Sequence, residues 1–265
     1  MDKDKSIRSI SRSLAILQTV NRFGAIHLND IAETTAIPYQ TAYRIVLALV
    51  QEGMLVREPH GRMYRVTALV KSLSNGFEDE SLLETVCAGP IADLTKQILW
   101  PVIVASRVGD VMIVRSSTTD MTSLSYRNYR PGHTMPLLHS TSGLTHLAFC
   151  EEEDRRTILD GLTLSQSPYA GYAHSKELAD ILIQVQADGY AVQKFNFGAP
   201  AAGKIASISV PLFETRRSPA ALTMIFFASA MTTEEALRRY VAPIKAAAAA
   251  ISAQLADGGE AAAAS

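Results

Sequence analysis

The chain of 265 residues is longer than a typical single domain, and its 48% hydrophobic and 19% charged residues exclude wholesale disorder, a collagen-like repeat and a coiled-coil rod. We find no apolar run of the ~20 residues that a membrane span needs and no signal-peptide core near the start, and the two cysteines suit a reducing compartment, so we expect a cytoplasmic protein. The net charge of −1 conceals a basic head, with ten Lys and Arg against six Asp and Glu in residues 1–76, and a body with fifteen against twenty.

Residues 1–67 predict three helices followed by a β-hairpin. Apolar residues at helical spacing indicate a first helix that is capped by Ser9 or Ser11 and broken at Gly24. A second helix is expected after Leu28, with Asn29 as its N-cap.

The third predicted helix, YQTAYRIVLALVQEG, follows Pro38 and ends at Gly53. Its apolar positions face inward: Ala42, Ile45, Val46 and Leu49. Its outward face is polar and aromatic near the N-terminus, and the side chains expected to reach DNA there are Tyr39, Gln40, Thr41, Tyr43 and Arg44. Gln and Arg can bond bidentately to adenine and guanine, so this helix is a candidate for reading the major groove.

The hairpin consists of MLVRE and MYRVT around the turn PHGR. Basic side chains occupy it, and we expect Arg57 and Arg62, with His60 and Arg65, to contact phosphates without reading sequence. The arrangement predicts a winged helix-turn-helix whose partner is double-stranded DNA. A winged helix used for protein contacts is the alternative.

The rest of the chain predicts an α+β body with an antiparallel sheet, because hairpins and helices follow one another without a βαβ rhythm. We expect a linker helix over 68–77, a longer helix ending near Leu99, a hairpin turning at Gly109, and a further strand over 124–127. Three helices follow, in HSTSGLTHLAFC, EEEDRRTILDGL and HSKELADILIQVQADGY, then strands at Ala191, in IASISVPLF and in AALTMIFFAS, the last central. A closing helix starts near Thr233, the body extends over 78–257, and 258–265 is expected to be a disordered tail.

The residues carry a family resemblance. The segment RSISRSLAILQTVNRFGAIHLNDIAETTAIPYQTAYRIVLALVQEGMLV resembles the N-terminal domain of IclR-type bacterial transcription regulators, and TMPLLHSTSGLTHLA, DGYAV and IASISVPLF resemble their effector domain. The resemblance implies a GAF-like effector domain, a dimer or tetramer of the chain on a palindromic operator, and contact with RNA polymerase if the protein activates. Within the family, five segments look most like an activator of aromatic-acid catabolism: FEDE, Trp100-Pro101, SGLTHLAFC, KIASISVPL and ASAMTTEEA.

The same resemblance implies where an effector binds. Loop contacts fall on Thr141 and Ser142 and strand contacts on Ser207 and Thr223, while an acidic family position is Gln193 here and a polar one is Ile225. Those two changes favour a larger, partly apolar acid, so an aromatic carboxylate is expected. From the residues themselves we add the helix-opening Ser140 and Gly143 and two arginines able to pair with a carboxylate, Arg115 and Arg127. Hydrogen bonding within the sheet is the alternative role for Ser207 and Thr223, and a surface or interface role is the alternative for the arginines.

Other chemistries fit the sequence less well. Gly198 to Lys204 has the spacing of a phosphate-binding loop, but Ile205 replaces the Ser or Thr that Mg²⁺ requires and a strand follows. His139, His146 and Cys150 lack a supporting carboxylate for a metal, so no metal or cofactor is expected. No catalytic motif is present, so an enzyme is not expected. The alternatives kept open are a repressor responding to another small organic acid and, less favoured, a ligand-binding enzyme.

Overall fold

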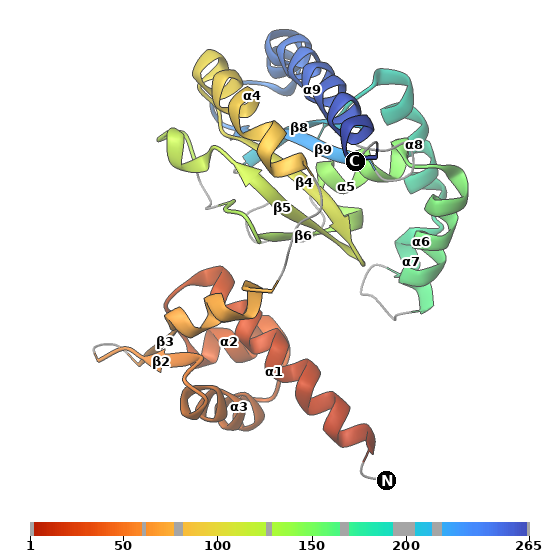
Figure 1. The fold of residues 1–265 in the computed structure, drawn as a ribbon. Helices are drawn as coiled ribbons and strands as arrows, with labels where there is room; N and C mark the ends of the chain where they lie inside the picture. Colours follow the sequence, from red (N-terminus) through yellow and green to blue (C-terminus); the bar gives the residue numbers. More distant parts are fainter. Residues whose placement is uncertain are drawn as a thin grey trace. The chain divides into compact units, whose positions relative to one another are not determined.

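The computed structural model describes residues 3–59, 62–76, 82–125, 129–164, 170–192, 205–213 and 219–263 (Figure 1). The chain divides into two compact units, Met1–Asp79 and Glu80–Ser265. Among the helices of the described ranges, none is both long and apolar enough to cross a membrane.

The N-terminal unit contains three helices and a small antiparallel sheet in the order β1-β3-β2. Its elements are α1 (Lys3–Phe23), β1 (Ile26–His27), α2 (Leu28–Thr35), α3 (Tyr39–Gln51), β2 (Leu55–Arg57), β3 (Met63–Val66) and the 3-10 helix η1 (Ala68–Ser74). The apolar faces of the helices meet in one core, whose fully buried members include Ile16, Val20, Ile31 and Val46. The predicted helix-turn-helix and hairpin are therefore confirmed.

The starts of two helices differ from the prediction. Helix α1 begins at Lys3, so Ser9 and Ser11 lie inside it. The sequence misled because serine is also accommodated inside a helix, where Ser13 Oγ donates to the carbonyl of Ser9 at 2.9 Å. Helix α2 begins at Leu28, so Asn29 lies in its first turn and is not the N-cap.

The C-terminal unit contains a six-stranded antiparallel sheet in the order β6-β5-β4-β9-β8-β7. Its strands are β4 (Val102–Val108), β5 (Val111–Ser117), β6 (Thr134–Pro136), β7 (Ala191–Val192), β8 (Ile205–Leu212) and β9 (Ala220–Phe227). Its helices are α4 (Leu83–Ile98), η2 (Thr119–Met121), η3 (Leu137–His139), α5 (Thr141–Phe149), α6 (Glu152–Leu164), α7 (Ala170–Ala173), α8 (Lys176–Asp188) and α9 (Thr233–Ala263). The α+β class, the antiparallel sheet and the interior position of β9 are as predicted.

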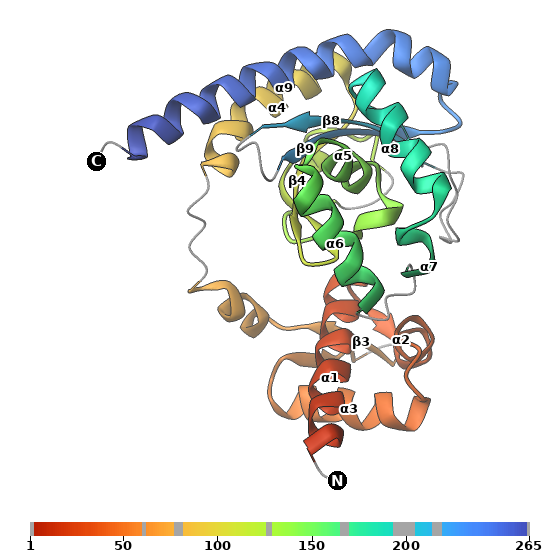
Figure 2. The same ribbon diagram turned by 90° about the vertical axis from the view of Figure 1, so that its right-hand side faces the viewer.

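Helices cover both faces of this sheet (Figures 1 and 2). Helices α4 and α9 pack on one face, in a core that includes Val104, Ile208, Leu222 and Phe226. Helix α5, with α6 and α8 beyond it, packs on the other face, where Leu147 joins the sheet residues Ala105, Met112 and Ala221. Successive residues of β8 and β9 point to opposite faces, so each of these strands contributes to both layers.

Several further segments depart from the predicted elements. Leu124 and Ser125 are not in a strand, and the remainder of the predicted strand 124–127 lies outside the described residues. Helix α9 continues to Ala263, into the segment expected to be a disordered tail, because its alanine-rich end has high helix propensity. The predicted linker segment forms the short 3-10 helix η1, which ends before Asn75.

Candidate DNA interface and ligand site

The N-terminal end of α3 presents the side chains that the sequence placed on its outer face. Pro38 precedes the helix, and its carbonyl accepts hydrogen bonds from the backbone of Thr41 and Ala42 at 2.8 and 3.0 Å, which starts the first turn. The side chains Tyr39, Gln40, Tyr43 and Arg44 are exposed, and Thr41 is half-buried. On the inner side Ala42, Ile45 and Val46 are buried, so helical spacing alone orients the polar face outward.

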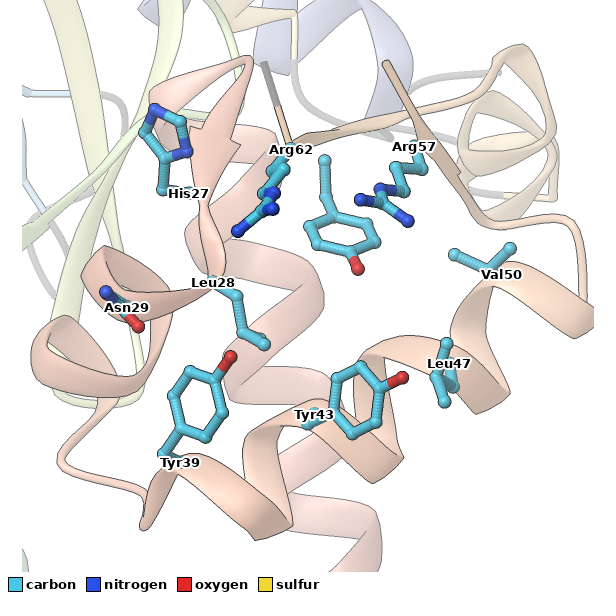
Figure 3. Close-up of a pocket in the computed structure, with 10 residues that line it drawn as sticks. His27, Leu28, Asn29, Tyr39, Tyr43, Leu47, Val50, Arg57 and Arg62 are labelled. Atoms are coloured by element: carbon cyan, nitrogen blue, oxygen red, sulfur yellow. The ribbon is translucent and has the colours of Figure 1, made fainter. Parts of the chain in front are cut away.

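A groove of about 410 Å³ separates α3 from the small sheet (Figure 3). Its lining comes from α3, the start of α2 and the hairpin: His27, Leu28, Asn29, Tyr39, Tyr43, Leu47, Val50, Arg57, Arg62 and Tyr64. Two arginines and a histidine lie among these residues, and the lining contains no carboxylate. In Figure 3 the labelled Arg57 and Arg62 extend from the hairpin toward the tyrosine rings of α3. Such a surface suits a polyanion.

Two residues that line this groove, His27 and Asn29, were not predicted from the sequence. His27 lines it because β1 pairs with β3, with Ile26 opposite Tyr64 and His27 opposite Met63, and Asn29 lines it from the first turn of α2. A two-residue strand leaves no alternating pattern, so this pairing could not be predicted from the sequence. Arg65 forms an ion pair with Glu58, which partly neutralises it, and His60 lies outside the described residues.

Five hydroxyls of the C-terminal unit form a buried cluster between α5 and the strands β8 and β9, here called the hydroxyl cluster. The oxygens of Thr141 and Ser207 lie 2.8 Å apart, and those of Ser142 and Thr223 lie 3.0 Å apart. Thr223 in turn donates to Ser209 at 2.9 Å. All five side chains are at most 8% exposed.

The structure thus brings together four residues predicted from separate segments, Thr141, Ser142, Ser207 and Thr223. Ser209 was missed, although it lies two residues beyond Ser207 and therefore on the same face of β8.

Ser140 and Gly143 fix the first turn of α5. Ser140 is the N-cap, and its Oγ accepts a hydrogen bond from the Gly143 backbone at 3.1 Å. Gly143 allows close approach of the preceding segment, because a Cβ there would lie 1.8 Å from the carbonyl oxygen of Leu137. This packing holds the start of α5 against the chain that precedes it.

An apolar cluster lies on the same face of the sheet as Thr223. It contains Ile103, Val114, Tyr129 and Ile225. Ile225 lies two residues after Thr223 on β9, and the ring of His133 meets Tyr129 edge-on at 5.1 Å between centroids. Hydroxyls beside an apolar and aromatic wall are the features expected of a site for a small, partly apolar ligand.

Of the remaining predicted ligand contacts, the structure describes Arg115, which lies away from this site. Arg115 lies on the face covered by α4, where its Nε donates to Glu84 at 3.2 Å. Trp100 packs edge-on against Phe226 in the core under α4 and α9. Arg127 and Gln193 lie outside the described residues.

His146 is a buried titratable residue in the middle of α5. Its Nδ1 lies 2.7 Å from the carbonyl oxygen of Pro219, the residue before β9. Burial lowers the pKa of His146 below its ordinary value, and the carbonyl contact opposes that shift. Burial also raises the pKa of the Cys150 thiol, one helical turn later, which disfavours a reactive thiolate. In the residues that the structure describes, no group of three or more potential ligands is placed to hold a metal.

Comparison with known proteins gives matches over both units. Residues 9–59 match the IclR helix-turn-helix domain, and residues 84–253 match the C-terminal domain of bacterial IclR transcriptional regulators. The HTH-type transcriptional regulator KdgR of Escherichia coli is 23% identical over 260 residues, which cover 96% of each chain.

Solved structures share the fold. An IclR family regulator from Brucella abortus has a TM-score of 0.63 at 19% identity, covering 95% of this chain and 92% of that one. An IclR homologue from Microbacterium hydrocarbonoxydans, solved in complex with 4-hydroxybenzoate, has a TM-score of 0.59 at 21% identity, covering 94% of this chain and 99% of that one.

Proposed function

This chain belongs to the IclR family of bacterial transcriptional regulators, and from that premise we propose that a small aromatic carboxylate controls its binding to an operator. The family assignment makes it a DNA-binding regulator with an effector domain, and not an enzyme. The proposal adds the class of effector, activation of an aromatic-acid catabolic operon, and a cytoplasmic homo-oligomer, a dimer or tetramer, as the working form.

The observation that carries the effector class is the hydroxyl cluster beside an apolar wall. Ser142 lies in the first turn of α5, where the helix dipole favours an anion, and hydroxyls suit the oxygens of a carboxylate. Tyr129 and Ile225 on the same face suit an aromatic body. Because the family's polar position is Ile225 here, we favour an aromatic acid over a small oxoacid.

Activation is favoured over repression by the resemblance of several segments to MhpR, the activator of 3-(3-hydroxyphenyl)propionate catabolism. Those segments are Trp100-Pro101, SGLTHLAFC and ASAMTTEEA. In vitro transcription from the chain's own upstream promoter tests the sign directly. We expect RNA polymerase to initiate more often when protein and acid are both present, and a decrease would make the protein a repressor.

The DNA contacts of the proposal are assigned by position. The exposed start of α3, with Gln40 and Arg44, would enter the major groove, and Arg57 and Arg62 of the hairpin would contact phosphates. The groove between these elements carries positive charge, as a phosphate backbone requires.

Fluorescence anisotropy on the upstream intergenic DNA tests both domains at once. The protein is titrated at several salt concentrations, with and without 3-(3-hydroxyphenyl)propionate, benzoate, 4-hydroxybenzoate, glyoxylate and pyruvate. We expect sequence-selective, salt-dependent binding that an aromatic acid changes. Operator binding changed only by glyoxylate or pyruvate would replace the aromatic effector with a small oxoacid. Binding that no acid changes would remove the carboxylate from the proposal.

A further inference from the structure

The hydrogen bonds of the hydroxyl cluster have a direction. A hydroxyl carries one proton, and Thr223 donates its proton to Ser209 Oγ at 2.9 Å. Ser142 Oγ lies 3.0 Å from Thr223 Oγ1, and Thr223 has no second proton to give. Ser142 is therefore the donor in that contact. The three side chains form a chain in which Ser142 donates to Thr223 and Thr223 donates to Ser209.

This direction determines what Ser142 can offer a ligand. A carboxylate only accepts hydrogen bonds, so it needs a hydroxyl with its proton available. The proton of Ser142 is committed to Thr223, because the proton of Thr223 is committed to Ser209. Ser209 is 0% exposed, so bulk water does not compete with its hydroxyl for the proton of Thr223.

We propose that Ser209 is a positioning residue that sets this direction and thereby reduces the affinity of the site for a carboxylate relative to a neutral analogue. The proposal rests on the proposed function, in which a carboxylate binds at the start of α5. Without the Ser209 hydroxyl, Thr223 turns its proton toward Ser142. Ser142 then accepts from Thr223 and donates its own proton to the ligand.

Isothermal titration of the full chain with 3-(3-hydroxyphenyl)propionate and with its carboxamide tests the proposal. In Ser209→Ala the ratio of the carboxamide Kd to the acid Kd should rise about tenfold, the size of one charge-assisted hydrogen bond. A merely structural role for Ser209 would weaken both ligands together and leave the ratio unchanged. An unchanged or smaller ratio would overturn the proposal.

Thr145→Val is the matched control. Thr145 is fully buried beside Ser209, but its Oγ1 donates to the Ser209 backbone carbonyl at 3.4 Å and not to the hydroxyl. The substitution removes a buried hydroxyl of the same size while leaving the three-residue chain complete. The ratio of the two Kd values should stay at the wild-type value.

A second experiment needs no ligand. Melting temperatures are compared for wild type, Ser142→Ala, Ser209→Ala and the double variant. Each single variant leaves the Thr223 hydroxyl one of its two hydroxyl partners, Ser142 or Ser209, and the double variant leaves it neither. We expect the double variant to lose more than the sum of the two single losses. Additive losses would show that Thr223 does not couple Ser142 to Ser209.

The two experiments separate the proposal from the function on which it rests. If losses in melting temperature exceed additivity but neither wild type nor Ser209→Ala binds the acid, the hydroxyl chain stands, and the carboxylate effector and the ligand role of Ser209 both fall. If the acid binds and the Kd ratio does not change, the effector stands and the role of Ser209 is rejected.

Discussion

At the scale of single residues, the proposed DNA contacts give Arg44 a different role from Arg57 and Arg62: Arg44 is expected to read a base, and the other two are expected to contact phosphates. Arg44 is exposed one turn into α3, whereas Arg57 and Arg62 lie on the hairpin across the groove. A guanidinium in the major groove can bond to one guanine edge, while one beside the backbone contacts every sequence alike.

Replacing Arg44 should therefore affect specificity, and replacing Arg62 should affect salt dependence. Arg44→Ala is expected to cost ~1–3 kcal/mol of operator binding and to reduce the preference for operator over random DNA. Arg62→Ala should weaken both DNAs equally and reduce the slope of log K against log salt by about one. Anisotropy titrations measure both effects. Arg156→Ala, on exposed α6, is the control, and equal losses in all three variants would contradict the assignment.

The buried His146 should make stability depend on pH. Because burial lowers its pKa in the folded chain, the unfolded chain binds a proton at higher pH than the folded chain does. The contribution of neutral His146 to the free energy of unfolding is fully present above about pH 6.5. It falls as the pH drops below that value, by up to ~1.4 kcal/mol per pH unit. Urea denaturation at pH 7.5 and 5.5 measures the difference.

His146→Gln should reduce that pH dependence. The substitution also loses packing, which lowers the free energy of unfolding at pH 7.5. The comparison with wild type therefore uses only the difference in the free energy of unfolding between pH 7.5 and pH 5.5. An identical change in both proteins would assign the pH dependence to other groups.

At the scale of elements, the position of α5 depends on a glycine. Gly143→Ala places a methyl group 1.8 Å from the Leu137 carbonyl oxygen, which forces the backbone apart. We expect a loss of ~2–3 kcal/mol in the free energy of unfolding and weaker binding of the acid, since the hydroxyls of α5 move with the helix. Thermal and urea unfolding, with titration of the acid, measure both.

Gly161→Ala supplies the comparison within α6. Nothing lies within 4 Å of a Cβ at that exposed helical position, so alanine should stabilise the protein by ~0.5–1 kcal/mol. A similar loss in both variants would mean that the crowding at Leu137 is not the cause.

Elements with a long periodic pattern were predictable, and elements fixed by tertiary pairing were not. The apolar spacing of α3 and the continuous apolar run of β9 predicted their type and burial correctly. Strands β1 and β6 have two and three residues, too few for a pattern, and form because β3 and β5 are available to pair with them. The family resemblance supplied four members of the hydroxyl cluster, while Ser209 emerged only once the register of β8 and β9 was known.

At the scale of the whole molecule, the chain is two units with a boundary between Asp79 and Glu80, each with its own core. Each core is made from one continuous part of the chain, so each unit should fold alone. Allosteric linkage between the acid and the operator requires both units in one chain. If the acid changes operator affinity by some factor, the operator changes acid affinity by the same factor.

Separating the C-terminal unit should preserve its binding of the acid and remove the coupling of that binding to DNA. We expect residues 80–265 to bind the acid with the affinity of the full chain measured without DNA, and added operator DNA to leave that affinity unchanged. In the full chain, operator DNA should shift it. Calorimetry on the fragment and the full chain makes the comparison, and a fragment that folds but does not bind the acid would place part of the ligand site in the N-terminal unit.

Strands β8 and β9 contribute side chains to both faces of the sheet, and this bears on how ligand preference can change without loss of the fold. Along these strands, residues that face α5 alternate with residues that pack against α4 and α9, and the first set includes Ser207, Ser209, Thr223 and Ile225. Neighbouring positions are therefore constrained by different contacts. In the proposed ligand site, substitutions at these four positions should alter ligand preference, while the residues on the opposite face preserve the core. If the proposed site binds the effector, a library confined to these four positions would test new effectors on an unchanged core, which is the starting point that biosensor engineering needs.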